Sequence, residues 1–116
     1  MSAWPVELRL DKTKTTLTVS FESGERFALP AEYLRVESPS AEVQGHSPAQ
    51  KQIVGGKRDV KIARLEPVGN YAVRVLFDDR HDTGLYSWDY LHELGRDQAK
   101  KWSAYLQALR TKRLER

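Results

Sequence analysis

The sequence contains no cysteine. This absence excludes disulfide bonds, thiolate nucleophiles, cysteine-bound iron–sulfur clusters and zinc sites built from cysteine. The fold must therefore rest on side-chain packing, and the composition favours a reducing, cytoplasmic location. No apolar run approaches the roughly 18 residues of a membrane span, and no basic segment precedes an apolar one at the start, so we expect neither a membrane helix nor a secretory signal.

Length and charge indicate the number of domains and the class of partner. The 116 residues are 40% hydrophobic and 30% charged, which suits one domain over residues 1–116 with its core at about 5–110. The formal net charge of +3 is unevenly placed, because seven basic and two acidic residues lie within 96–116. The basic character is thus a property of the end of the chain, where we expect a basic, frayed tail at 110–116. We do not expect nucleic-acid binding, because the aromatic residues near this tail occupy apolar helix positions.

Alternation of apolar and polar residues indicates β-strands in two parts of the sequence. The predicted strands are, in order, 6–10, 17–21, 26–29, 60–68, 71–77 and 85–86. Ser23-Gly24 provides a tight turn in the first group, and Gly69-Asn70 provides one in the second. Each group is therefore expected to form antiparallel hairpins.

Helical signals occupy three short stretches. Pro30 suits the first position of a two-turn helix. Ser87 is a good N-cap for a helix that Gly95 is expected to end, and Asp97 is expected to cap a last helix with apolar residues at every third or fourth position. No periodicity survives in 37–58, which we expect to be a long loop. The fold class predicted is α+β: a mainly antiparallel sheet of two hairpins or a meander, with a short helix after the third strand and C-terminal helices packed on one face.

Acidic and imidazole side chains gather in one polar stretch. Asp78, Asp79, His81 and Asp82 lie within five residues, and His46 lies in the long loop. Imidazole and carboxylate groups suit a divalent metal, but the adjacent side chains of His81 and Asp82 point apart in an extended chain. The competing interpretations are that these residues cap turns and helix ends through hydrogen bonds, or that they act as acid and base.

Signatures of known enzyme classes are lacking. The serines are not part of a Gly-x-Ser-x-Gly elbow, and no Gly-x-x-x-x-Gly-Lys loop occurs. Gly55-Gly56-Lys57-Arg58 places glycines beside cations and has the composition of an anion site, but we predict no strand before it and no helix after it. We therefore expect a protein that is not an enzyme.

Three blocks, read together, resemble a known family. They are LRVESPSAEVQGH at 34–46, PVGNYA at 67–72 and FDDRHDTGLYSWDYL at 77–91. They are similar to the gamma-butyrobetaine hydroxylase-like N-terminal domain, also known as a domain of unknown function, and the likeness covers about 5–95. In the hydroxylases this domain precedes a separate 2-oxoglutarate-dependent barrel. The resemblance therefore implies a stand-alone accessory domain and not an oxygenase.

The resemblance also bears on a metal site. In the hydroxylase branch the domain holds a structural zinc through a Cys-x-Cys-x-x-Cys motif and a histidine; the matching positions here are Ser38, Ser40 and Val43, with His81 as the histidine. Hydroxyl groups and a valine cannot replace thiolates, so we expect no zinc of that type. The long loop should still lie against the polar stretch, with His81 hydrogen-bonded between them. Arg80 stands where the family pattern predicts glycine, and a positive φ there would cost about 1 kcal/mol.

We therefore expect a non-catalytic accessory domain that binds an unidentified protein partner and needs no cofactor. The expected binding surface comprises His46, His81, Asp82, Tyr86, Arg35 and Glu42. The alternative is an accessory protein that binds iron or zinc through His46, His81 and Asp82. Because this domain also occurs appended to Mrp-type iron–sulfur carrier ATPases, docking to such a carrier is a further alternative.

Overall fold

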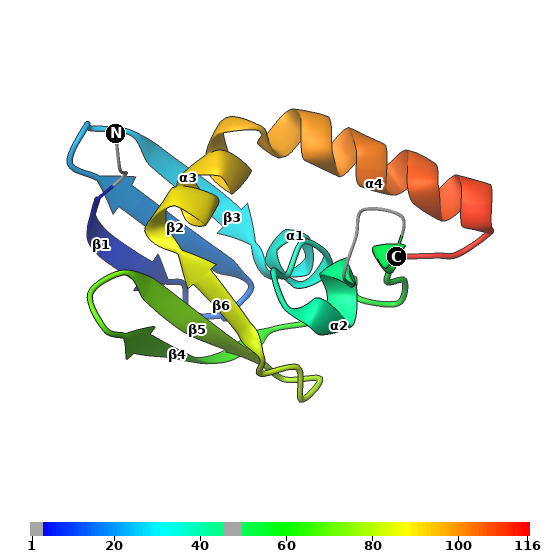
Figure 1. Cartoon of the computed structure of the whole chain (residues 1–116), viewed down its shortest axis with the longest axis horizontal. Helices are drawn as coiled ribbons and strands as arrows, with labels where there is room; N and C mark the ends of the chain where they lie inside the picture. The colour runs from blue at the N-terminus through cyan, green and yellow to red at the C-terminus, as the bar shows by residue number, and fades with distance from the viewer. Residues whose placement is uncertain (1–3, 46–49) are drawn as a thin grey trace.

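Two three-stranded antiparallel sheets form the body of the protein, as Figure 1 shows. The computed structural model describes residues 4–45 and 50–116. In chain order its elements are β1 (Pro5–Leu10), β2 (Thr16–Phe21), β3 (Arg26–Pro30), α1 (Ala31–Val36), α2 (Ala41–Gln44), β4 (Ile62–Val68), β5 (Ala72–Phe77), β6 (Gly84–Ser87), α3 (Trp88–Arg96) and α4 (Gln98–Lys112). The strand orders are β1-β2-β3 and β4-β5-β6, which confirms the predicted α+β class.

The alternating pattern of the sequence decides which face of each sheet is buried. In β2 the residues Leu17, Val19 and Phe21 are buried, whereas the polar residues between them are only partly covered. The turns form where glycine was expected to allow them, with φ of 93° at Gly24 and 55° at Gly69. Both hairpins are therefore set by local sequence.

The main apolar core lies between the two sheets and the helices, and a smaller cluster of Val36, Tyr105 and Leu109 joins α1 to α4. Members of the main core from the sheets and helices include Leu17, Val19, Leu29, Leu34, Ile62, Val73, Val75, Leu91 and Leu94. A backbone hydrogen bond of 2.8 Å from the Ile62 N–H to the Lys14 carbonyl links β4 to the turn between β1 and β2. Burial of the main core supplies the main stabilisation, because each fully buried aliphatic side chain contributes about 1.5–3 kcal/mol.

The start of α3 follows the prediction, but its end does not. Ser87 caps the helix by accepting a 3.1 Å hydrogen bond from the Tyr90 N–H. Gly95 does not end it, since α3 continues through Arg96. A Cβ at position 95 would lie 2.2 Å from Cγ of Phe27. Gly95 is therefore needed for close packing of α3 on β3 rather than as a helix stop.

The end of the chain also departs from the prediction. Asp97 makes no capping hydrogen bond with its side chain, and α4 continues through Lys112, past the residue at which fraying was expected to begin. After α4, Arg113 takes a left-handed conformation with φ of 56°, and the chain turns back so that the Glu115 carbonyl accepts a 2.8 Å hydrogen bond from the Gly56 N–H. Figure 1 shows the C-terminus beside the segment that precedes β4. Within the described ranges, no helix is both long and apolar enough to cross a membrane.

Four tyrosines join segments that are distant in the chain. Each hydroxyl donates to a backbone carbonyl; the pairs are Tyr33 to Leu94 at 2.7 Å, Tyr86 to Leu34, Tyr90 to Glu37 at 2.5 Å and Tyr105 to Val54 at 2.5 Å. Burial raises the pKa of all four phenols, that of Tyr105 to about 12. The irregular segment after α1 is thus tied to α3 and α4 by the hydroxyl groups of Tyr90 and Tyr105.

Candidate functional site

The long loop and the connection after β5 meet at one place. Ser38 Oγ lies 2.9 Å from Nε2 of His81, and Ser40 Oγ lies 2.7 Å from Oγ1 of Thr83. We call these four residues the neutral cluster. The structure confirms that the two segments lie together with His81 hydrogen-bonded between them. It also places one helical turn, α2, inside the predicted loop. Ser40 caps this turn by accepting a 3.2 Å hydrogen bond from the Glu42 N–H.

Both ring nitrogens of His81 are engaged. Nδ1 lies 3.2 Å from Oε2 of Glu42; a carboxylate only accepts, so Nδ1 carries the proton and Nε2 accepts from the Ser38 hydroxyl. Ser38 Oγ in turn accepts from the Ser40 N–H at 3.2 Å. Burial, helped by the charge of Arg35, lowers the pKa of His81 below its usual value. The imidazole is therefore neutral at physiological pH.

Gly84 makes room for the neutral cluster. A Cβ at this position would lie 2.8 Å from Ser38 Oγ and 3.0 Å from the Tyr86 ring. Both distances are shorter than ordinary contacts between a Cβ and its neighbours. Glycine at the start of β6 thus permits the close approach of β6 to the loop after α1.

An ionic cluster lies beside the neutral one. Oδ2 of Asp79 accepts from Nε of Arg35 at 2.8 Å and from Nζ of Lys57 at 2.6 Å, and Oδ1 accepts from the His81 N–H at 3.1 Å. Burial alone would raise the pKa of Asp79, but the hydrogen bonds from Lys57, Arg35 and the His81 backbone outweigh it and lower the pKa to about 2. The ionic cluster of Arg35, Lys57 and Asp79 therefore joins α1, the segment before β4 and the turn after β5.

The turn that carries both clusters is strained. Arg80 has a φ of 72°, its N–H donates to the Phe77 carbonyl at 3.2 Å, and the Phe77 N–H donates to the His81 carbonyl at 3.0 Å. A left-handed conformation costs a residue with a side chain about 1–2 kcal/mol. The positive φ expected at Arg80 is thus confirmed, and it directs Asp79 and His81 into the protein on either side of the turn.

Three residues predicted to lie on the binding surface are buried. Arg35, His81 and Tyr86 are 9%, 5% and 0% exposed, so their prediction as surface residues is wrong. Tyr86 points inward because β6 turns its other face to solvent, and its hydroxyl bonds the Leu34 carbonyl. Arg35 lies on a helix whose residues are all buried, and its Nη1 is buried without a hydrogen-bond partner among the described residues. Such a donor costs about 1–3 kcal/mol.

The other predicted surface residues fare differently. Glu42 and Asp82 are exposed on α2 and on the turn after β5, while His46 lies outside the described residues. Lys57 and Thr83 complete the two clusters; sequence reasoning missed Thr83 and named Lys57 only as one cation of the stretch at 55–58. Thr83 adjoins the polar stretch and had that signal; nothing in the local pattern around Lys57 marks it as a partner of an aspartate.

The donor atoms at the neutral cluster do not fit the cysteine-bound zinc of the hydroxylase branch. Ser38 and Ser40 offer neutral hydroxyls that already bond to His81 and Thr83, and Val43 is a buried side chain without a donor. Across residues 4–45 and 50–116, no group of three or more His, Cys, Asp or Glu side chains is placed to hold a metal ion.

Comparisons with known proteins identify the family. No curated protein matches the chain. Two structures determined by NMR in solution are similar to it: one shares 44% identity and a TM-score of 0.84 over 99% of this chain and 86% of its own, the other 41% and 0.87 over 100% and 91%. A crystal structure of a DUF971-family protein of unknown function from Acidithiobacillus ferrooxidans ATCC 23270 shares 37% identity and a TM-score of 0.66 over 78% of this chain and 91% of its own. The model of the family "Gamma-butyrobetaine hydroxylase-like, N-terminal" matches residues 8–92, and the chain belongs to this family.

Proposed function

We propose that this domain is a non-catalytic interaction module that presents a preorganised acidic face to a protein partner. The observation that carries the proposal is that the side chains suited to chemistry are bonded to one another. His81 uses both ring nitrogens and Asp79 uses both carboxylate oxygens within the protein. Groups bonded in this way support a role in holding two loops in place, not in attacking a substrate.

The proposed interaction face lies on α2 and the turn after β5. It consists of five exposed residues: Glu42, Asp78, Arg80, Asp82 and Thr83. Three are acidic and one is basic, so negative charge prevails. Because the clusters beneath hold both segments, little ordering is needed when a partner binds. Complementary charge favours a partner with a basic surface.

A charge-reversal experiment tests this face. The variant E42K/D82K is compared with wild type and with the matched control E7K/E22K, whose positions are exposed on the first sheet and its turn. Proteins captured from native lysate by wild type and control, but lost by E42K/D82K, are the expected result. The same proteins captured by all three would contradict the proposed face.

An Mrp-type iron–sulfur carrier ATPase is the first defined partner to test, because related domains occur fused to such carriers. Titration of the labelled domain with the purified carrier should give saturable binding that weakens in E42K/D82K and at higher salt. No saturation up to about 100 μM carrier would exclude this partner and leave the lysate experiment to decide the face.

We propose further that the fold needs no resident metal. The neutral cluster supports this, since its hydroxyls and imidazole are satisfied by one another. Wild type dialysed against iron, zinc or manganese should retain no stoichiometric metal by elemental analysis, and EDTA should leave its Tm unchanged. The variant S38C/S40C/V43C, which supplies thiolates beside His81, should bind about one zinc and lose Tm in EDTA.

The competing function is a metal-binding accessory protein. The contact between His81 and Glu42 is the observation that favours it, because an imidazole and a carboxylate lie 3.2 Å apart. Stoichiometric metal retained by wild type and lost in H81A and E42A would establish this function in place of a metal-free module. Retention unchanged in both variants would place the metal elsewhere and still contradict the metal-free fold.

A further inference from the structure

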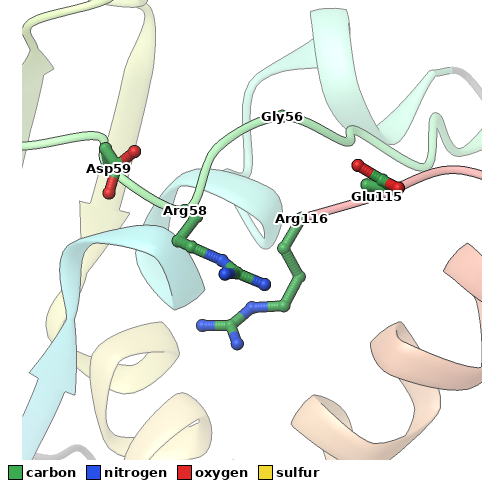
Figure 2. A pocket seen from close by; sticks show the side chains of 5 residues that line it. All are labelled: Gly56, Arg58, Asp59, Glu115 and Arg116. Atoms are coloured by element: carbon green, nitrogen blue, oxygen red, sulfur yellow. The ribbon is translucent and has the colours of Figure 1, made fainter.

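We propose that the chain has a second, separate site: an anion pocket between the segment before β4 and the returning C-terminal tail, selective for a phosphate group. The pocket has a volume of about 480 Å³ and is lined by Gly56, Arg58, Asp59, Glu115 and Arg116. Figure 2 shows that the guanidinium groups of Arg58 and Arg116 extend into the same space. Gly56 and Arg58, from the glycine-and-cation sequence at 55–58, form one wall, whereas Lys57 of that sequence belongs to the ionic cluster.

Arg116 is held in place from behind. Its Nε and Nη2 donate to Glu32 Oε2 at 3.0 Å and Oε1 at 2.7 Å, and Glu32 is a buried residue of α1. The guanidinium also lies over the Trp102 ring, 5.4 Å from its centroid. This fork leaves Nη1 of Arg116 without a hydrogen bond among the described residues. The two N–H groups of Nη1 are therefore available to a ligand, on a guanidinium that Glu32 holds in place.

Arg58 provides the second cation. It is exposed, and in the described part of the chain it forms no ion pair. Asp59 and Glu115 line the pocket but form no ion pair with either arginine, and Figure 2 shows their carboxylates at the outer ends, away from the two guanidinium groups. Arg116 keeps Glu32 as its counter-charge, whereas Arg58 has none among the described residues, so an anion between the two guanidinium groups would supply the missing counter-charge of Arg58.

The two walls of the pocket are fastened to each other. The Gly56 N–H donates to the Glu115 carbonyl at 2.8 Å, and the Leu114 N–H donates to the Leu109 carbonyl at 2.9 Å, which fixes the tail after α4. Gly56 has a φ of 71°, and a Cβ there would meet no atom within 4 Å. The backbone at Gly56 is thus open to an approaching ligand on the side that a side chain would otherwise cover.

A phosphate group fits this arrangement best among small anions. Guanidinium groups match its oxygens with paired donors, and the charge of Arg58, which has no counter-charge among the described residues, offsets part of its negative charge. The pocket is larger than one phosphate ion, so it has room for the organic part of a phosphate monoester. The shared recognition element is the phosphate, supplied either as the free ion or as the ester.

The test is a titration of amide resonances in the full chain. Inorganic phosphate, added at constant ionic strength against chloride, should shift the amides of Gly56, Glu115 and Arg116 in a saturable way. Arg58→Gln should weaken binding by about fivefold or more, because one of two charge-assisted contacts is lost. The control Arg110→Gln removes an exposed arginine of α4 that has no ion pair within 4–45 and 50–116, and it should bind as wild type does.

Each outcome decides the proposal. Arg58 is exposed and unpaired, so its variant should fold normally, and equal binding by R58Q and R110Q would overturn the site. Shifts that grow linearly, or that chloride reproduces, would also overturn it, since they indicate screening alone. Glycerol 2-phosphate forms the second arm: tighter binding than phosphate identifies an ester as the ligand, and equal or weaker binding identifies the free ion.

Discussion

Asp79 and His81 lie on the same turn, but the Asp79 carboxylate is charged and the His81 imidazole is neutral. The ionic cluster places one carboxylate between two cations, whereas the neutral cluster satisfies an imidazole with a hydroxyl donor and a peripheral carboxylate. Both clusters are anchored in the turn after β5, but only the ionic cluster leaves unpaired buried charge when it is broken. The comparison predicts that substitutions removing one polar group from each cluster lower the free energy of unfolding by unequal amounts.

The largest effect is expected from Asp79→Asn. The change leaves Arg35 and Lys57 without a counter-charge, and breaking a buried pair costs about 3–5 kcal/mol. Because the Asp79 side chain is 20% exposed, we expect a loss of about 2–4 kcal/mol in the free energy of unfolding, measured in urea. The control Asp82→Asn, on an exposed residue of the same turn, should change it by less than about 0.5 kcal/mol.

Ser38→Ala should have a smaller effect. It removes the donor to Nε2 of His81 and one acceptor for the Ser40 N–H, which costs about 1–2 kcal/mol for neutral groups. Ser103→Ala on the exposed face of α4 serves as the control. A loss in S38A that equals the loss in D79N would show that charge does not distinguish the two clusters.

Lowering the pH should weaken the clusters one after the other. The pKa of His81 is lowered in the folded protein, so its contribution is complete above about 6.5 and is lost as the pH falls through its folded pKa. The pKa of Asp79 is about 2 against 3.8 in the unfolded chain, so its contribution is lost between about 3.8 and 2. Urea unfolding at a series of pH values should show the first loss abolished in H81Q and the second in D79N. Persistence of the first loss in H81Q would assign it to another group.

Arg80→Gly should give the smallest change in the free energy of unfolding, and this change should be an increase. Glycine adopts a φ of 72° without the steric cost that Arg80 bears. We expect a gain of about 0.5–1 kcal/mol, since the larger freedom of glycine in the unfolded chain offsets part of the relief. Thermal unfolding measures it. A loss of stability would show that the Arg80 side chain contributes more than its backbone costs.

The local sequence pattern was sufficient to predict the strands of the two sheets, but it was insufficient to predict which residues form the candidate site. Alternation identified β2, and Ser87 identified the start of α3, because both depend on neighbouring residues. Leu85 and Tyr86 are both apolar, yet one is 39% exposed and the other 0%. The pattern could not assign their faces, since pairing with β5 decides them.

The meeting of the two loops came from family resemblance and not from periodicity. No local signal joins Lys57 to Asp79 or Arg116 to Glu32, because each pair forms only when distant segments pack. Packing between distant segments also explains why the end of α3 at Gly95 and the course of the chain after α4 were predicted wrongly. Gly95 carries a helix-stop signal, but Phe27 of another element occupies the space beside it.

The four phenols that bond distant carbonyls have one further consequence. Their hydroxyls cannot ionise while those bonds last, and burial raises the pKa of each. In strong alkali, deprotonation and loss of the native structure become one event. The part of the phenolate ultraviolet absorbance that comes from these four tyrosines, as distinct from the exposed Tyr71, therefore reports unfolding without an added label.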